Sequence, residues 1–346
     1  MVALWLILIL AVIQGILEWL PVSSEGQLVL ILTWLQESEQ ALAIAIFLHL
    51  GTMIAVIIRF RNDFLLLFNW KLWGKTKTKE EELNSIQEEN TSNENLANDQ
   101  EKKNYSKNDS TAEKDSDLSE IHVKKKEQRI LWKFLLVATL MTGIIGVPIY
   151  LLLEYALSEG ELLEFANGRV SSGDIITIGI GLFLIATGLF ILFSRRKVAE
   201  KELIELSTWE MILVGATQGL AIIPGVSRSG TTMGTLLIRS VKDNEALRGS
   251  FLLSVPAVLG GNILLIIIDL IQGDVSFEGI PWYGMILAII ISGVVGYITI
   301  DLFLWIARKI NFGWFCLLLG GLAVIITLIM VILSLTTTKT TAAIFV

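Results

Sequence analysis

Two short polar sequences, QGILEWLPVSSEGQ (residues 14–27) and PGVSRSGTT (residues 224–232), interrupt long apolar stretches of this chain. A break rich in proline, glycine and serine ends a helix and leaves backbone groups without partners. At membrane depth, such backbone is tolerated only inside protein or beside a polar cavity. We therefore expect two re-entrant helical hairpins, at residues 1–35 and 209–240, whose polar tips are buried and functional.

The composition predicts that the rest of the chain lies in a membrane. Of the 346 residues, 53% are hydrophobic and 18% are charged, whereas a soluble domain carries about 25% charged residues. A helix needs about 20 apolar residues to cross a bilayer. Six further stretches have that length: residues 41–60, 130–153, 174–193, 247–270, 281–306 and 314–333. We expect an all-α polytopic membrane protein with six transmembrane helices, forming a single membrane domain over residues 1–346.

Charge and rare residues exclude several other classes. The net charge of −7 argues against a nucleic-acid binder, and the single cysteine cannot form an intrachain disulfide. Two histidines are too few for a metal site built from histidine. Residues 74–128 differ in character, since lysine, glutamate, asparagine and serine dominate there, and this composition predicts a disordered insertion.

The two interrupted regions resemble each other. Gln14-Gly15 matches Gln218-Gly219, and VSSEG at residues 22–26 matches VSRSG at residues 226–230, both at a separation of 204 residues. Three spans follow each hairpin. Because three is an odd number, the second half must lie upside down relative to the first. The sequence therefore predicts an inverted-topology repeat of residues 1–194 and 209–334, an architecture that gathers its sites near the membrane midplane.

The basic residues predict the orientation of the chain. Lysine and arginine occur in the connections around residues 61–129, 195–201, 242–248 and 308–309, and the remaining connections are acidic or nearly free of them. Connections rich in basic residues lie in the cytoplasm. We therefore expect a multi-pass protein of the cytoplasmic membrane with a cytoplasmic loop at residues 61–129 and both termini outside.

Glu18 and Arg228 are the residues from which chemistry is expected. A carboxylate at membrane depth is costly unless it has a partner, and Gln14 lies one helical turn before Glu18 on the same face. Arginine, serine hydroxyls and free N–H groups at a helix start bind phosphate. A nearby carboxylate holds a divalent cation or takes a proton from serine. The pattern also suits a Glu–Arg pair that only joins the two halves, with serines that only cap broken helices.

His49 lies in the span at residues 41–60. A hydrogen-bonded interior histidine is the ordinary interpretation of such a residue. If His49 reached the hairpin tips, it would supply a base.

Both interrupted segments resemble the signature segments of the undecaprenyl-diphosphate phosphatase family, the integral membrane phosphatases of the bacitracin-resistance (BacA) type. The runs SFLLSVPAVLGG at residues 250–261 and HLGT at residues 49–52 are also similar to that family. The resemblance covers the whole membrane part and omits only residues 74–128. It implies removal of the terminal phosphate from a polyprenyl diphosphate at the outer face of the membrane, which recycles a lipid carrier of cell-envelope synthesis and removes the target of bacitracin.

The resemblance also implies roles for single residues. Gln14 and Glu18 correspond to a motif associated with binding of a divalent cation, Mg²⁺ or Ca²⁺, and with acid–base chemistry. Ser24 corresponds to a proposed nucleophile, and Arg228 corresponds to the arginine that binds phosphate. A further set of polar residues is expected to contact the substrate: Ser23, Gln27, Ser227, Ser229, Thr231 and Thr232.

One departure from the family puts catalysis in question. Many members end the first motif in PVSS-x-G-H, whereas this chain has Gln27, which cannot act as a base or nucleophile at neutral pH. Glu25 adds a carboxylate two residues earlier that could partly compensate. The departure favours a second hypothesis, a polyprenyl-phosphate flippase or transporter that uses the same site without hydrolysis. The sequence leaves open the prenyl chain length, the attacking group (Ser24 or water) and a homodimeric state.

Overall fold

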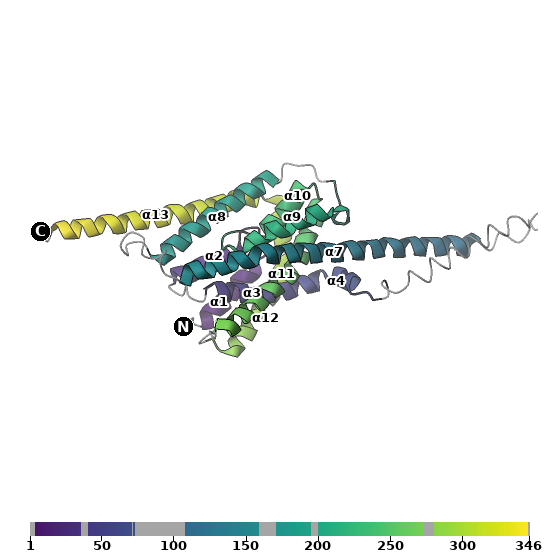
Figure 1. Cartoon of the computed structure of the whole chain (residues 1–346), viewed down its shortest axis with the longest axis horizontal. Coiled ribbons are helices and arrows are strands. Elements are labelled where there is room, and N and C mark those ends of the chain that lie inside the picture. Colours follow the sequence, from purple (N-terminus) through teal and green to yellow (C-terminus); the bar gives the residue numbers. More distant parts are fainter. Residues whose placement is uncertain are drawn as a thin grey trace, which may run out of the picture. The chain divides into compact units, whose positions relative to one another are not determined.

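Figure 1 shows the computed structural model of the chain, which describes residues 4–35, 41–70, 72, 108–158, 171–194, 200–272 and 280–344. The chain divides into two compact units, which we describe separately. The larger consists of Met1–Phe60 and Phe134–Val346, and the smaller is Arg61–Lys133. Every regular element in the described residues is helical, as the sequence predicted.

Six long apolar helices are long enough to cross a membrane, which confirms the six predicted spans. Many of their leucine, isoleucine and valine side chains face outward, as expected where lipid takes the place of water. The six helices are α3 (Ala41–Arg59), α7 (Asn108–Ser158), α8 (Ser172–Ser194), α11 (Asp243–Gln272), α12 (Trp282–Lys309) and α13 (Phe312–Ile344).

Four shorter helices form two pairs at the interrupted regions. The first pair is α1 (Leu4–Leu17) and α2 (Ser24–Trp34), and the second is α9 (Thr208–Gly219) and α10 (Arg228–Ile238), with a turn of 3₁₀ helix, η3 (Leu220–Ile222), after α9. None has the length of about 20 residues that a bilayer requires. The breaks coincide with the proline-containing and serine-containing sequences from which they were predicted.

The second helix of each pair begins in the same way. The hydroxyl of Ser23 accepts a hydrogen bond from the N–H of Gly26 at 3.2 Å, and the hydroxyl of Ser227 accepts one from the N–H of Gly230 at 3.1 Å. Both serines are therefore N-caps, which satisfy an N–H group that the first helical turn leaves free. The two capping serines are 204 residues apart, which is the separation of the sequence repeat.

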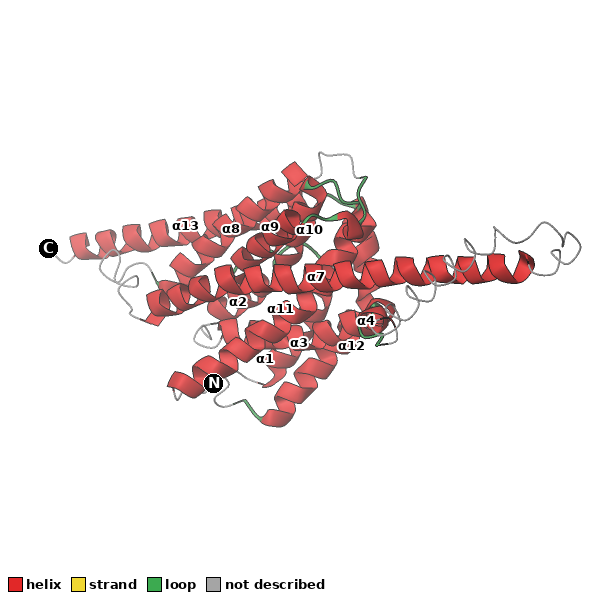
Figure 2. Ribbon diagram, turned by 45° about the vertical axis from the view of Figure 1, so that its right-hand side comes forward, coloured by secondary structure: helices red, strands yellow, loops and turns green. Residues whose placement is uncertain are grey.

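The first helix of each pair packs on a long helix of the other half. The Thr299 hydroxyl of α12 donates to the carbonyl of Gly15 at 2.9 Å, and the Thr142 hydroxyl of α7 donates to the carbonyl of Gly215 at 3.1 Å. A Cβ atom on Gly215 would lie 2.2 Å from the carbonyl oxygen of Ala138, so only glycine permits this approach. In Figures 1 and 2, α8 and α13 run side by side, and Gly181 of α8 meets Gly320 of α13 at a similar close contact.

Within the smaller unit, α4 (Arg61–Leu67) packs on the portion of α7 that precedes Phe134. The Gln128 amide donates to the carbonyl of Leu66 at 2.9 Å, and the Trp132 indole donates to the carbonyl of Leu67 at 2.8 Å. Helix α7 begins at Asn108, so residues 108–128 of the polar insertion are described as helix. Residues 74–107 of the predicted insertion lie outside the described residues.

Glu210 anchors the start of the second pair, outside the six spans. Its buried carboxylate accepts hydrogen bonds from the Ser207 N–H at 2.8 Å, from Lys201 at 3.0 Å and from Arg239 at 2.9 Å. Burial alone would raise the pKa of Glu210. The three hydrogen-bond donors lower the pKa by more than burial raises it, so the pKa is about 2. The ionised carboxylate thus ties α9 to the end of α10.

Replacing Glu210 with glutamine is expected to lower Tm by roughly 4 to 8 °C at pH 7, because the neutral amide gives up about 2 kcal/mol of charge-assisted hydrogen bonding. Partial exposure of Lys201 and Arg239 limits the effect. Since the pKa is lowered from 4.5 to about 2, this stabilisation is complete above pH 4.5 and disappears as the pH falls toward 2. Thermal unfolding in detergent should show the Tm difference shrinking over that window, and a difference independent of pH would contradict the assignment.

Candidate active site

The two breaks meet inside the larger unit. Gly225, in the second break, has a φ of 100°, which favours glycine. A Cβ atom on Gly26, in the first turn of α2, would lie only 2.8 Å from the backbone nitrogen of Gly225. The two glycines thus allow the loops to touch. Glu18 follows the last residue of α1 and Arg228 is the first residue of α10, so this contact brings their side chains together.

The Glu18 carboxylate is buried and has four side-chain partners. Its Oε1 atom forms an ion pair with Nη2 of Arg228. Its Oε2 atom accepts hydrogen bonds from the Gln14 amide at 2.9 Å and from the Ser24 hydroxyl at 2.8 Å, and lies 3.2 Å from Nε2 of His49. The approach of Glu18 and Arg228 predicted from the sequence is present in the structure.

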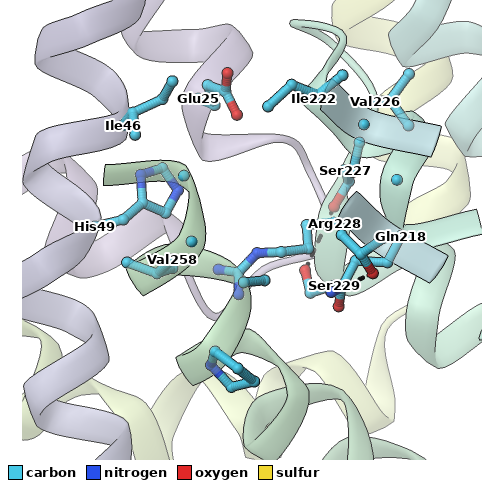
Figure 3. Close-up of a pocket in the computed structure, with 18 of the residues that line it drawn as sticks. Glu25, Ile46, His49, Gln218, Ile222, Val226, Ser227, Arg228, Ser229 and Val258 are labelled. Atoms are coloured by element: carbon cyan, nitrogen blue, oxygen red, sulfur yellow. Dashed lines mark hydrogen bonds between the residues drawn. The ribbon is translucent and has the colours of Figure 1, made fainter. Parts of the chain in front are cut away.

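His49 is the site residue to which the sequence interpretation gave too little weight. Its Nδ1 atom lies 2.6 Å from the carbonyl oxygen of Ala45, which fixes the ring along α3. Its Nε2 atom is thereby directed to Glu18. Figure 3 shows the side chain of Arg228, from the start of α10, reaching towards His49. The signal in the sequence was a histidine inside a span, where an ionisable side chain is expensive and marks a functional position.

A cavity of about 220 Å³ opens beside this cluster. Its wall comes from both breaks and from α3, α7 and α11, all within the larger unit. Four buried polar atoms on residues of this wall have no hydrogen-bond partner, namely Nη1 of Arg228, Oε1 of Glu25, Oε1 of Gln218 and Oγ1 of Thr139. Buried polar atoms without partners are costly, so these four are explained best by a ligand that contacts them.

Most of the predicted site residues reach this cavity. Glu18, Ser23, Ser24, Ser227, Arg228 and Ser229 belong to its wall. Gln14 is not part of the wall, and its amide donates to Glu18, which is. Gln27, Thr231 and Thr232 are absent from the wall.

The three residues away from the wall are turned towards the backbone. The Gln27 amide lies 3.4 Å from the carbonyl oxygen of Val22. The hydroxyls of Thr231 and Thr232 donate to the carbonyl oxygen of Arg228 at 3.0 and 2.8 Å. The threonines therefore brace the turn that carries Arg228.

The oxygen atoms next to Arg228 are of the kind that Mg²⁺ and Ca²⁺ bind. Glu18 supplies a carboxylate, and Oε1 of Gln14 is buried without a hydrogen-bond partner. Within the described residues no three or more histidine, cysteine, aspartate or glutamate side chains form a metal-binding group. The protein thus offers a partial set of oxygen ligands, which suits a cation that also binds phosphate oxygens and water.

The chain is similar to a family of membrane proteins over nearly its whole length. The family described as "Bacitracin resistance protein BacA" matches residues 7–98 and 99–325. A protein of Methanothrix thermoacetophila named undecaprenyl-diphosphatase is 35% identical over 323 residues, which cover 92% of this chain and 95% of the relative. Proteins of the same name from Haloarcula marismortui and Halothermothrix orenii are 32% and 29% identical, each over 92% of this chain and 95% and 96% of their own length.

Proposed function

Since this chain belongs to the bacitracin resistance protein BacA family, we propose that it is an undecaprenyl-diphosphate phosphatase of the membrane. It releases the terminal phosphate of the lipid diphosphate and leaves the lipid monophosphate. The relatives named undecaprenyl-diphosphatase cover more than nine-tenths of the chain. The reaction returns the lipid carrier to cell-envelope synthesis, and loss of the diphosphate removes the target of bacitracin.

The observation that carries this proposal is the unpartnered guanidinium nitrogen of Arg228. Nη2 of Arg228 is held by Glu18, whereas Nη1 is buried without an acceptor, and Arg228 belongs to the cavity wall. A planar guanidinium can bind a carboxylate and a phosphate oxygen at the same time. The Ser227 and Ser229 hydroxyls, on either side of Arg228, add donors at the start of α10. These groups would stabilise the charge on the transferring phosphoryl group, which is the largest catalytic contribution expected here.

The hydrogen bond from Ser24 to Glu18 supports a direct chemical step. The Ser24 oxygen attacks the terminal phosphorus while its proton passes to Glu18. The bond from that phosphorus to the bridging oxygen breaks, and the lipid monophosphate leaves with the electron pair. Water then releases phosphate from Ser24. A water molecule bound to Glu18 in place of the Ser24 hydroxyl would reach the same products in one step.

We also propose that Glu18 and Gln14 hold a Mg²⁺ or Ca²⁺ ion together with oxygens of the diphosphate. Such an ion neutralises phosphate charge and polarises the phosphorus–oxygen bond. The support is the buried, unpartnered Oε1 atom of Gln14 beside Glu18.

Replacing Gln14 with glutamate is expected to lower the Mg²⁺ concentration for half-maximal phosphate release by about tenfold, because ligand charge sets the affinity for hard cations. This concentration is measured by removing bound cations with a chelator and then following phosphate release as Mg²⁺ is added back. The matched control is Asn311→Asp, which exchanges an amide for a carboxylate at a position outside the cavity wall and keeps the oxygen that accepts from the N–H of Gly313. An unchanged midpoint in Gln14→Glu, or an equal shift in both variants, would count against the cation site.

The two helix pairs are proposed to be re-entrant hairpins related by an inverted repeat. The shared serine caps, and the packing of α1 on α12 and of α9 on α7, support this. The distribution of basic residues supports a cytoplasmic loop at residues 61–129 and termini outside. The cavity would then face lipid diphosphate in the outer leaflet.

A purified-protein assay tests the function. With Mg²⁺ in detergent, the protein is expected to release phosphate from undecaprenyl diphosphate. The second candidate is a lipid transporter, because broken helices that meet at a buried polar site are also used for transport. Translocation of polyprenyl phosphate across vesicles, without any phosphate release, would favour the transporter and overturn the phosphatase.

A further inference from the structure

The cavity has an apolar end that the phosphate chemistry does not use. Its polar end contains Arg228, Glu18 and the serines. Away from them the wall consists mainly of apolar side chains and glycines from α3, η3, α7 and α11, with Thr139 and Thr142 of α7 as its polar members. In Figure 3, Ile46 and Ile222 lie above the guanidinium group of Arg228. A cavity with a cationic end and an apolar end matches a ligand with an anionic head and a hydrocarbon chain.

Two glycines in this wall have no packing role. A Cβ atom on Gly143 of α7 or on Gly260 of α11 would meet no atom within 4 Å. The glycines of α9 differ, since a Cβ atom on Gly215 or Gly219 would lie within 3 Å of α7. Those two glycines allow helices to touch, whereas Gly143 and Gly260 leave space within the cavity wall. Glycine weakens a helix relative to alanine. Because Gly143 and Gly260 are not needed for helix packing, the space that they leave calls for a functional explanation.

The space beside Gly143 and Gly260 lies in the part of the cavity through which a lipid chain would enter. Ile46 is near the start of α3, whereas Val147 and Leu264 are in the later parts of α7 and α11. In the proposed topology α3 and α11 cross the membrane in opposite directions, so these segments belong to the same half of the bilayer. Gly260 is exposed at the protein surface. A cavity of about 220 Å³ cannot hold a long polyprenyl chain, so the chain must leave sideways into lipid.

We infer that Gly143 and Gly260 hold open an apolar slot that binds the first isoprene units of the lipid substrate and directs the remaining chain into the bilayer. This inference rests on the proposed phosphatase function. The slot makes chain length, and not only the diphosphate, a determinant of recognition. A side chain at either glycine would fill the slot and leave the phosphate-binding groups in place.

The test is the kcat/KM of Gly143→Leu and Gly260→Leu on prenyl diphosphates of one, three and eleven isoprene units. With three and eleven units, the kcat/KM of each variant is expected to fall about tenfold or more, as it does when apolar contacts in a hydrophobic pocket are lost. With one unit, the loss is expected to stay within about threefold, because little of that chain needs the slot. Gly321→Leu is the matched control, because a Cβ atom there also meets no atom within 4 Å but Gly321 is not in the wall.

A second measurement is independent of turnover. A prenyl diphosphate with a photoreactive group on its second isoprene unit is expected to label the peptide around Gly143 or Gly260 in the wild type. Labelling should fall in the leucine variants and persist in Gly321→Leu. Equal losses for all chain lengths, or labelling only elsewhere, would overturn the slot. A wild type that hydrolyses none of the three substrates would instead overturn the proposed function.

Discussion

Replacing Arg228 with alanine is expected to reduce phosphate release from undecaprenyl diphosphate by about 100- to 1000-fold. The guanidinium group places positive charge where negative charge develops on the transferring phosphoryl group, and removal of one such donor has an effect of that size. The substitution also leaves Glu18 as a buried carboxylate without its cation, so Arg228→Ala is expected to lose stability as well. Activity and Tm must therefore be measured together in detergent.

Arg228→Lys separates catalysis from stability. A lysine keeps the charge beside Glu18 but is a point charge that cannot hold a carboxylate and a phosphate oxygen through separate nitrogens in one plane. It is expected to retain most of the Tm and still lose about tenfold or more in kcat/KM. Arg59→Ala is the control, because Arg59 also pairs with an acidic residue, Asp301, at 2.8 Å but at an exposed position away from the cavity. Full activity in Arg228→Lys and Arg228→Ala would remove the arginine from the mechanism.

The sequence predicted the fold well because the signals for it are local. A run of about 20 apolar residues is visible without knowledge of its neighbours, and all six predicted spans correspond to helices. The breaks at Pro21 and Pro224 are also local, because serine and glycine at fixed positions define a helix start. The pairing of Glu18 with Arg228 could be predicted because a charged side chain in an apolar region is energetically expensive unless it has a partner. Both residues are charged groups within otherwise apolar regions.

The site was predicted less completely because it depends on how helices face one another. Gln27 lies in the same motif as Ser24, yet on α2 its amide is directed to the Val22 carbonyl and away from the cavity. Thr231 and Thr232 likewise bond to the backbone of their own helix. His49 lies outside both motifs, and its position beside Glu18 results from the packing of α3 against α1 and α2. No spacing along the chain encodes that contact.

His49 offers a testable answer to the question raised by Gln27. Many family members have a histidine where this chain has glutamine, which suggested a compromised enzyme or a transporter. The structure places the imidazole of His49 3.2 Å from Glu18 and within the cavity wall, so α3 supplies a titratable nitrogen group that can exchange a proton with Glu18. His49→Gln is therefore expected to lower kcat by about 100-fold or more, the contribution of a positioned acid–base group. The KM for undecaprenyl diphosphate is expected to change little, because Arg228 and the serines still hold the phosphates.

Gln27→His distinguishes this explanation from an impaired site. If His49 already serves the reaction, a second histidine at position 27 adds no missing group, and kcat/KM is expected to stay within about threefold of the wild type. In the double variant His49→Gln, Gln27→His, any recovery of activity measures whether position 27 can replace position 49. A tenfold gain from Gln27→His alone would mean that the wild-type site lacks its base. Unchanged kcat in His49→Gln, with Tm also unchanged, would assign His49 to structure and leave Glu18 as the group that accepts the proton of Ser24.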